Sequence, residues 1–221
     1  MTLFWIRTTS EKNIIGAQYP QIQTMDGTVN KNAPDSLYNV YPDELPDFIP
    51  NLNHFVLEKS AIVTDVLSAA MISYGFIVNE KVKDTLCGHR LPTYQFYPAT
   101  IKHNGTFLKN YYWFFYISDV LDFIDYGKTR FFITDMVDNK IEECRNIGSA
   151  QRLRSLKEVL PDDRNVHSDC IFFEKALTAS FDLFKVSFGN YRTYISERLA
   201  SALQNTSGLT ISLSNNVLLN E

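Results

Sequence analysis

FIVNEKVKDTL at residues 76–86 and TYISERLASAL at residues 193–203 carry the same pattern, and this repeat decides the fold class. Each stretch begins with an apolar run, passes through one polar residue and a glutamate, and continues as an amphipathic segment. Residues 77–86 align with residues 194–203 at a constant offset. The change from a strand-like run to a helical spacing of apolar residues predicts two similar strand–helix–strand units.

The polar residue and the glutamate mark the start of each predicted helix. Asn79 and Ser196 favour the N-cap position, where a side-chain oxygen accepts a hydrogen bond from a free backbone amide. Glu80 and Glu197 then place negative charge at the positive end of the helix dipole. Because a short polar residue followed by an acid is the ordinary way to satisfy the first amides of a helix, we interpret both pairs as structural and not catalytic.

The rest of the chain alternates expected strands with short helices. Aromatic and apolar runs predict strands, and apolar residues three and four apart predict helices; the strands span 2–7, 13–24, 93–101, 111–117 and 209–214, and the helices span 63–71 and 149–160. The predicted fold class is therefore α+β, with mixed or mostly antiparallel sheets and a few short amphipathic helices. The length fits a single domain over residues 1–221, or two closely packed halves of about 1–145 and 146–221.

Composition and charge narrow the classes of function. Hydrophobic residues make up 45% of the 221 residues, which is enough for a packed core. The net charge of -4 argues against binding to nucleic acid, which needs a clustered cationic face. The three widely spaced cysteines predict no disulfide framework, and the sequence contains no apolar run of about 18 residues. The apolar run of residues 3–6 is too short for a signal peptide, so we expect none. We therefore expect a cytoplasmic protein with no membrane and no nucleic-acid partner.

No pattern of residues predicts an active site. The four histidines are widely spaced, and the Cys-Gly-His stretch at residues 87–89 lacks a second pair of ligands at zinc-like spacing. The glycine-rich and nucleophile motifs of common enzymes are absent from the sequence. His167 and Cys170 are close in sequence but lie at the entrance of an expected strand, so we do not predict a nucleophile pair. We expect a protein without catalytic residues, metal or cofactor.

The segment of residues 25–50 differs from the rest of the chain. It contains four of the eight prolines together with several acids. Prolines at this density exclude a regular helix or a central strand, because proline fixes φ and lacks an amide hydrogen. We therefore predict a long irregular excursion over the surface, and loops of this length are often functional.

Four stretches follow one another in an order that resembles a known family. They are GFIVNEKVKDTL, YQFYPATI, YYWFFYISDVLDFIDYGKTRFFI and YRTYISERLASALQNTSGLTISL, over roughly residues 60–215. In this order they resemble the bacterial immunity proteins of polymorphic toxin systems, in immunity families eleven and forty-three. FYPA and DFIDYGKT are the more specific pieces, and NTSGLTI departs from the tighter glycine turn usual in the family. The matched positions that we interpret as structural are Asn79, Glu80, Phe96, Tyr97, Pro98, Trp113, Asp125, Ser196 and Glu197.

The resemblance implies a non-enzymatic α+β protein that binds a cognate toxin protein, encoded nearby, and neutralises it. If that toxin has a basic cleft, acidic clusters on the immunity protein would raise the association rate. The candidate contact residues are Asp35, Asp43, Glu44, Asp47, Asp119, Asp122 and Asp125. Two other functions stay open: a small hydrolase or transferase whose residues assemble only in the fold, and an adaptor that forms a homo-oligomer through its aromatic sheet.

Overall fold

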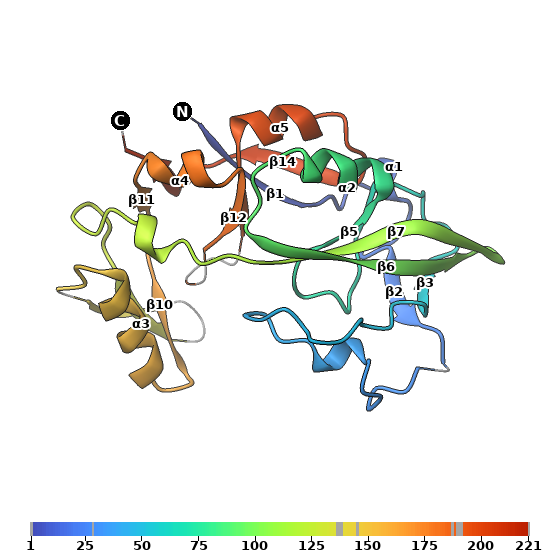
Figure 1. Ribbon diagram of the computed structural model, residues 1–221, viewed down its shortest axis with the longest axis horizontal. Helices are drawn as coiled ribbons and strands as arrows, with labels where there is room; N and C mark the ends of the chain where they lie inside the picture. Colours follow the sequence, from blue (N-terminus) through green and yellow to red (C-terminus); the bar gives the residue numbers. More distant parts are fainter. Residues whose placement is uncertain are drawn as a thin grey trace. The chain divides into compact units, whose positions relative to one another are not determined.

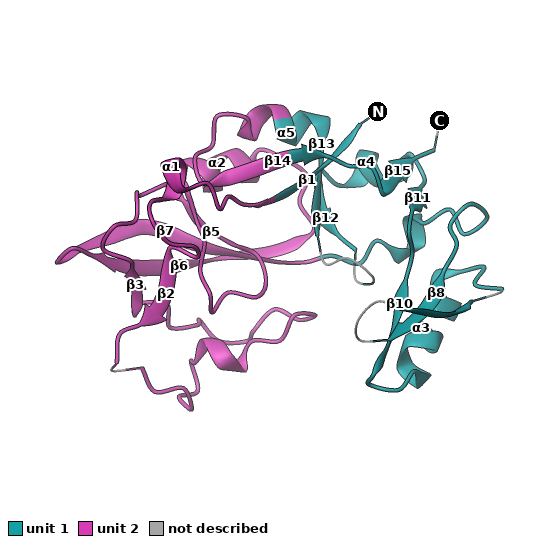
Figure 2. Ribbon diagram, turned by 180° about the vertical axis from the view of Figure 1, so that it is seen from behind, with its two compact units in different colours: residues 1–6, 118–200, 212–221 teal, residues 7–117, 201–211 magenta. Residues whose placement is uncertain are grey.

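The α+β class is confirmed. The computed structural model describes residues 2–27, 29–135, 139–144, 146–186, 188 and 192–220 (Figure 1). Within these residues lie fifteen β-strands, in mostly antiparallel sheets, and five short α-helices. Contacts divide the chain into two compact units, coloured in Figure 2: unit 1 comprises Met1–Ile6, Ser118–Ala200 and Ser212–Glu221, and unit 2 comprises Arg7–Ile117 and Ser201–Ile211. Each unit consists of segments that are not contiguous in sequence, so the units do not coincide with the expected halves of about 1–145 and 146–221. The division into one domain or two stays a prediction.

Unit 2 is built on a six-stranded sheet with the order β2-β3-β6-β7-β5-β4, in which only β3 and β6 are parallel neighbours. Its elements are α1 (Lys12–Ile15), β2 (Ile22–Met25), the 3-10 helix η1 (Leu37–Asn39), β3 (Phe55–Leu57), β4 (Val66–Leu67), β5 (Phe76–Asn79), α2 (Glu80–Cys87), β6 (Thr93–His103) and β7 (Thr106–Ile117). Figure 1 shows β6 and β7 as one long hairpin. Asn104 and Gly105 close it, and both have the positive φ that two-residue hairpin turns favour.

The core of unit 2 lies on one face of this sheet. Trp113 and Phe115 of β7 and Ile77 of β5 point to that face and are at most 2% exposed. Because side chains alternate along a strand, Phe114 and Tyr116 point to the opposite face, where their rings stack with centroids 5.1 Å apart. These four consecutive residues of β7 are buried on both faces, which explains why the strand reads as an unbroken aromatic run.

Unit 1 contains three smaller sheets, with the orders β12-β13-β1-β14, β10-β8-β9 and β11-β15. Its elements are the 3-10 helix η2 (Leu121–Phe123), β8 (Phe132–Asp135), β9 (Lys140–Glu143), α3 (Ala150–Val159), β10 (Arg164–His167), β11 (Ile171–Phe173), α4 (Ala176–Ser180), β12 (Leu183–Lys185), β13 (Thr193–Ser196) and β15 (Val217–Leu219). β1 (Leu3–Thr8), α5 (Glu197–Leu203) and β14 (Leu209–Leu213) have residues assigned to both units. Leu153 of α3, Phe173, Phe184 and Tyr194 form the centre of the core, each 0% exposed.

Both helix starts in the repeat are built as predicted. The Asn79 side chain accepts a hydrogen bond from the Val82 amide at 3.0 Å, and the Ser196 hydroxyl accepts one from the Leu199 amide at 3.3 Å. A glutamate occupies the first turn of α2 and of α5. The apolar residues that face inward from both helices are buried. The two polar–acidic pairs are therefore helix starts, as the sequence indicated.

The repeat extends back to an aspartate that lies 14 residues before each cap. Asp65 accepts a hydrogen bond from the Asn79 side-chain amide at 2.8 Å, and Asp182 accepts one from the Ser196 hydroxyl at 2.8 Å. The backbone follows the same pattern, because the amide of each cap residue donates to the carbonyl of its aspartate at 2.8 Å and 2.9 Å. A basic residue two positions after each cap forms an ion pair with the same carboxylate. A hairpin, a cap and a helix thus form one structural unit that occurs twice.

The strands of the two copies lie in the same order within their sheets, but they follow one another in a different order along the chain. β7 lies between β5 and β6 in the first copy, and β1 lies between β13 and β14 in the second. The Ser214 amide donates to the Leu3 carbonyl, and the Thr9 amide donates to the Gly208 carbonyl, both at 2.9 Å, so β1 runs antiparallel to β14. β7 follows β6 directly, whereas β1 precedes every other element. The second copy is therefore a circular permutation of the first.

The carboxyl group of Asp65 makes the stability of unit 2 depend on pH. Burial acts to raise its pKa, but hydrogen bonds from Ser207 and Asn79, together with the charge of Lys81, outweigh burial and hold the pKa below its usual range. A carboxyl group with a lowered pKa in the folded state stabilises the fold above its unfolded-state pKa of about 3.9. This stabilisation is lost as the pH falls through the folded-state pKa.

We expect the Asp65→Asn variant to lose less unfolding free energy than the wild type between about pH 6 and about pH 3, because the variant has no carboxylate at this position to protonate. Urea unfolding at several pH values measures this loss. Asp84→Asn, on the exposed side of α2, is the matched control and is expected to follow the wild type. Parallel curves for Asp65→Asn and the wild type would contradict this role of Asp65.

Two of the expected elements are wrong. Residues 63–71 form no helix, since β4 lies there as an edge strand. The Gln21 side chain holds this stretch extended by donating to the Ile62 carbonyl at 2.7 Å and accepting from the Ser68 amide at 3.2 Å. The expected strand over 13–24 contains α1, and its strand portion begins only where β2 does. Contacts between segments distant in sequence act at both places, since the Ile62 amide donates to the carbonyl of Ile15, the last residue of α1, at 3.0 Å.

Candidate functional site

The strongest candidate site lies in unit 2 on residues 33–50, named the proline-rich segment from here on. Apart from η1 it is irregular, as predicted. Leu37 is buried, and Val40 packs partly buried against the core of the unit. Tyr41 and Ile49, in contrast, are 64% and 74% exposed. The segment therefore anchors itself with some apolar side chains and presents others to solvent, and no sequence periodicity separates the two kinds.

Hydrogen bonds define the course of the proline-rich segment. The Asn39 side-chain amide donates to the Ala33 carbonyl at 2.9 Å and spans η1. The Asn51 amide donates to the Asp35 carbonyl at 2.8 Å and brings the two ends of the segment together. The exposed side chains are thus carried by a closed loop, which lowers the entropy cost of ordering them against a partner.

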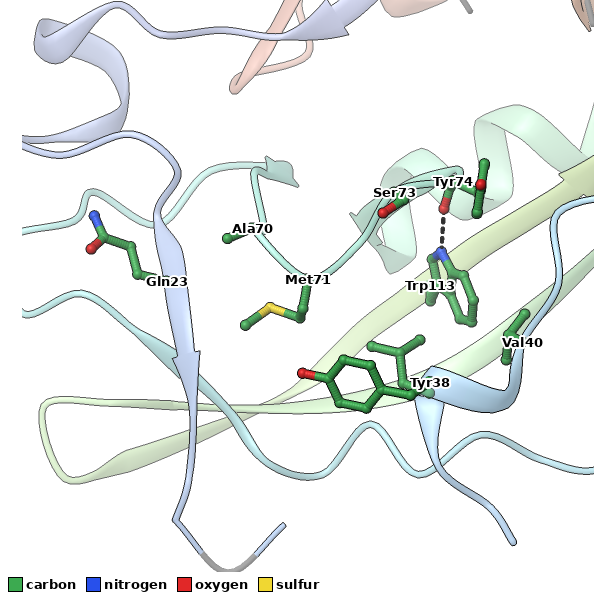
Figure 3. Close-up of a pocket in the computed structure, with 9 residues that line it drawn as sticks. Gln23, Tyr38, Val40, Ala70, Met71, Ser73, Tyr74 and Trp113 are labelled. Atoms are coloured by element: carbon green, nitrogen blue, oxygen red, sulfur yellow. Dashed lines mark hydrogen bonds between the residues drawn. The ribbon is translucent and has the colours of Figure 1, made fainter. Parts of the chain in front are cut away.

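A pocket of about 490 Å³ opens beside η1 (Figure 3). It is lined by Gln23, Leu37, Tyr38, Val40, Ala70, Met71, Ser73, Tyr74 and Trp113. The Trp113 indole is 2% exposed and donates to the Tyr74 carbonyl at 2.7 Å, so its ring is fixed. The Tyr38 side chain is 52% exposed and belongs to the rim. None of these nine lining residues is a carboxylate, histidine or cysteine, so the pocket suits an apolar group better than acid–base chemistry.

Within the residues that the structure describes, the negative charge of the four acids of the proline-rich segment is not neutralised by an ion pair. Asp43, Glu44 and Asp47 are exposed, and Asp35 is half-buried. In the described part of the chain, no Lys, Arg or His nitrogen lies within 4.0 Å of these carboxylates. The sequence contains no lysine or arginine between residues 32 and 58. This stretch therefore presents an acidic field to an approaching partner.

The second predicted cluster of acids, in unit 1, is partly neutralised. Asp119 and Asp122 both accept hydrogen bonds from Arg154 of α3, at 2.7 Å and 3.3 Å. These bonds raise the pKa of the Arg154 guanidinium. The two carboxylates are exposed but share one cation. They are weaker candidates for a contact surface than the acids of the proline-rich segment.

Asp125 has a structural role in unit 1. Its carboxylate accepts hydrogen bonds from the Gly127 amide at 2.9 Å, from the Lys128 amide at 3.2 Å and from the Asn220 side chain at 2.8 Å. The bond from Asn220, followed by those from the two backbone amides, holds the pKa of the carboxyl below its usual range. Asp125 thus shapes the turn and connects it to the C-terminal residues, which is a structural role rather than a contact role.

The remaining matched positions of the family resemblance also serve the fold. The Phe96 and Phe114 rings stack with centroids 5.0 Å apart, and the Tyr97 and Trp113 rings lie 5.8 Å apart across the β6–β7 hairpin. Pro98 lies exposed in β6, opposite a tyrosine of β7. These residues build the sheet that carries the pocket and only Trp113 lines it.

A second pocket, of about 550 Å³, lies in unit 1 and offers no reactive thiol. It is lined by Ile133, Glu142, Glu143, Cys144, Ile147 and Leu156. Burial, with the charges of the two neighbouring glutamates, raises the pKa of the Cys144 thiol, so it stays protonated near neutral pH. Burial, with the charge of Asp169, raises the pKa of Cys170 in the same direction. Among the described residues, no group of three or more His, Cys, Asp and Glu is arranged to hold a metal ion.

No family model matches the chain, and no curated protein matches it. Within the described residues, the helices are all too short or too polar to cross a lipid bilayer.

Proposed function

We propose that the protein is a non-enzymatic immunity protein that binds and neutralises a cognate toxin protein encoded nearby, and that it does so in the cytoplasm. The observation that carries this proposal is the proline-rich segment, where exposed Tyr38, Tyr41 and Ile49 lie among carboxylates that form no ion pair with any described residue. Large apolar side chains surrounded by charge are typical of surfaces that bind other proteins.

The tyrosines and the acids of this surface contribute to binding in different ways. Tyrosine contributes large contact area at low conformational cost, and it is enriched among the residues that carry most binding energy. The acids contribute less to affinity, but they accelerate association with a basic partner and select against acidic ones. A toxin domain with a basic cleft meets both requirements, and the resemblance to immunity proteins supports that choice of partner.

The proposal is tested by co-expression with the product of the gene immediately upstream. We expect that product to arrest host growth when expressed alone, and we expect growth to recover when this protein is expressed with it. The two proteins should also co-purify as a complex of fixed stoichiometry. A harmless neighbour, or a toxic one that is neither rescued nor bound, would remove the main support for the immunity function.

The alternative functions have weaker support in the geometry. A hydrolase or transferase needs a pocket where carboxylate, histidine and thiol groups converge, and neither pocket described above combines all three. An adaptor that self-associates through the aromatic strand needs those rings at the surface, but Tyr111 and the four residues Trp113–Tyr116 are at most 5% exposed. A protein-binding role for the proline-rich segment accounts for more of the observed features than either alternative.

A further inference from the structure

We propose that the 490 Å³ pocket is an anchor site, which takes one aromatic or long aliphatic side chain from a partner polypeptide whose neighbouring residues are lysine or arginine. The inference rests on the proposed function only in taking the partner to be a polypeptide with a basic surface. It adds the place where that partner is held and the chemistry of the segment that enters.

The lining of the pocket selects the apolar part of this ligand. Leu37, Val40, Met71 and Trp113 supply aliphatic, thioether and aromatic surface. Methionine adapts its shape to a variety of apolar partners. Trp113 is fixed through its hydrogen bond to the Tyr74 carbonyl, so this wall is preformed. A volume of about 490 Å³ lies in the range of pockets that bind small ligands, and it therefore accommodates a single large side chain.

The surroundings of the pocket select the basic part. Asp35 lies two residues before lining residue Leu37, and Asp43 lies three residues after lining residue Val40. Because consecutive Cα atoms are about 3.8 Å apart, these acids lie within about 8 Å and about 11 Å of the lining backbone. Basic residues one to three positions from the anchor in an extended partner segment cover the same distances.

The chain itself shows that the rim attracts a cation. The Lys31 ammonium group lies 5.2 Å from the centre of the Tyr38 ring, in a cation–π contact. Tyr38 lines the pocket and is also one of the exposed aromatic residues of the segment. A lysine or arginine of the partner can make a cation–π contact of the same kind, and the neighbouring carboxylates attract it as well. A segment that combines an apolar anchor with basic neighbours thus satisfies both halves of the site.

The test uses three synthetic peptides as probes: GSKKFKKSG, GSKKSKKSG without the apolar anchor, and GSEEFEESG with the charge reversed. The full-length protein is labelled with ¹³C at the methionine methyl groups, and the Met71 signal is assigned with a Met71→Leu variant. Met25 packs against the core of the same unit without lining the pocket, so its methyl signal is an internal control.

We expect GSKKFKKSG to shift the Met71 signal and to bind at least about tenfold more tightly than GSKKSKKSG, because burial of the phenylalanine ring is worth at least that factor. GSEEFEESG should leave the signal unchanged. Ala70→Trp fills the pocket from an exposed lining position and should abolish binding, whereas Ala17→Trp, at an exposed position outside the pocket, should not.

Equal affinity of GSKKFKKSG and GSKKSKKSG would overturn the inference, since it would mean attraction by charge alone. Binding of GSKKFKKSG without a shift at Met71, or undiminished binding to Ala70→Trp, would overturn it as well. The peptide discrimination is measured on the unaltered protein and therefore does not depend on how the variants fold. A failed growth rescue together with successful peptide binding would reject the toxin as partner and leave the anchor site standing.

Discussion

Replacing Gly75 with alanine is expected to lower the free energy of unfolding by about 2 to 5 kcal/mol. Gly75 has φ +76°, a conformation that costs any residue with a Cβ about 1–2 kcal/mol. In addition, a Cβ at this position would lie 2.0 Å from the carbonyl oxygen of Phe114, in the strand that forms the centre of the sheet. Because the clashing atom belongs to the backbone of a buried strand, it cannot move aside as a side chain would.

Substitutions at two other glycines of unit 2 distinguish the cost of the positive φ from the cost of the steric clash. Gly105, in the β6–β7 turn, has φ +82° with open space around it, so Gly105→Ala should show the conformational cost alone. Gly27 has neither a positive φ nor a neighbour within 4 Å, so Gly27→Ala should be nearly neutral. The expected order of urea midpoints is Gly27→Ala, then Gly105→Ala, then Gly75→Ala as the lowest. A Gly75→Ala variant as stable as Gly105→Ala would show that the close approach of the two backbones is not rigid.

Removing the Arg198 side chain is expected to cost about 3 kcal/mol or more. Its partner, Asp182, is 0% exposed and forms an ion pair with the Arg198 guanidinium as well as a hydrogen bond with the Ser196 hydroxyl. Arg198→Ala would leave the negative charge of Asp182 in the core without this guanidinium. A buried charge deprived of a cationic partner destabilises a fold far more than the same change at the surface.

The first copy of the repeat provides the matched control. Lys81 occupies the position that corresponds to Arg198, but its side chain is 66% exposed and its ammonium lies 3.9 Å from an Asp65 carboxylate that is 20% exposed. An ion pair in this setting contributes roughly 0.5 kcal/mol or less. We therefore expect Lys81→Ala to be nearly neutral in the same urea titration. Equal losses for Arg198→Ala and Lys81→Ala would contradict the view that only the second copy depends on its ion pair.

Local patterns were sufficient to predict the repeat. The side chains of Asn79 and Ser196 each accept a hydrogen bond from the amide three residues later, so neighbouring residues were enough to predict both caps. The helix expected over residues 63–71 failed because the backbone there is held by the Gln21 side chain, which lies more than 40 residues earlier. The place of β1 inside the second copy depends on pairing between opposite ends of the sequence, which no local pattern reveals.

The candidate site was predictable only in part. The acids of the proline-rich segment stood out in the sequence, but the exposure of Tyr41 and Ile49 did not, because irregular backbone has no periodicity that separates inward from outward positions. Asp119 and Asp122 looked like an equally acidic cluster. Their partial neutralisation by Arg154, more than 30 residues later, could not be predicted from the sequence, because only the fold of unit 1 brings these residues together. The pocket likewise combines residues from four separate parts of the chain.

The rate at which the protein associates with its proposed partner, the toxin protein encoded nearby, tests the central claim most directly. The variant combining Asp35→Asn, Asp43→Asn, Glu44→Gln and Asp47→Asn should associate at least about tenfold more slowly than the wild type at low ionic strength, and the difference should shrink as salt screens the charges. The double variant Asp119→Asn with Asp122→Asn should stay within about twofold of the wild type, since Arg154 already offsets those carboxylates. Unchanged rates for the fourfold variant, or a larger loss for the double variant, would show that the proline-rich segment is not the surface that meets the partner.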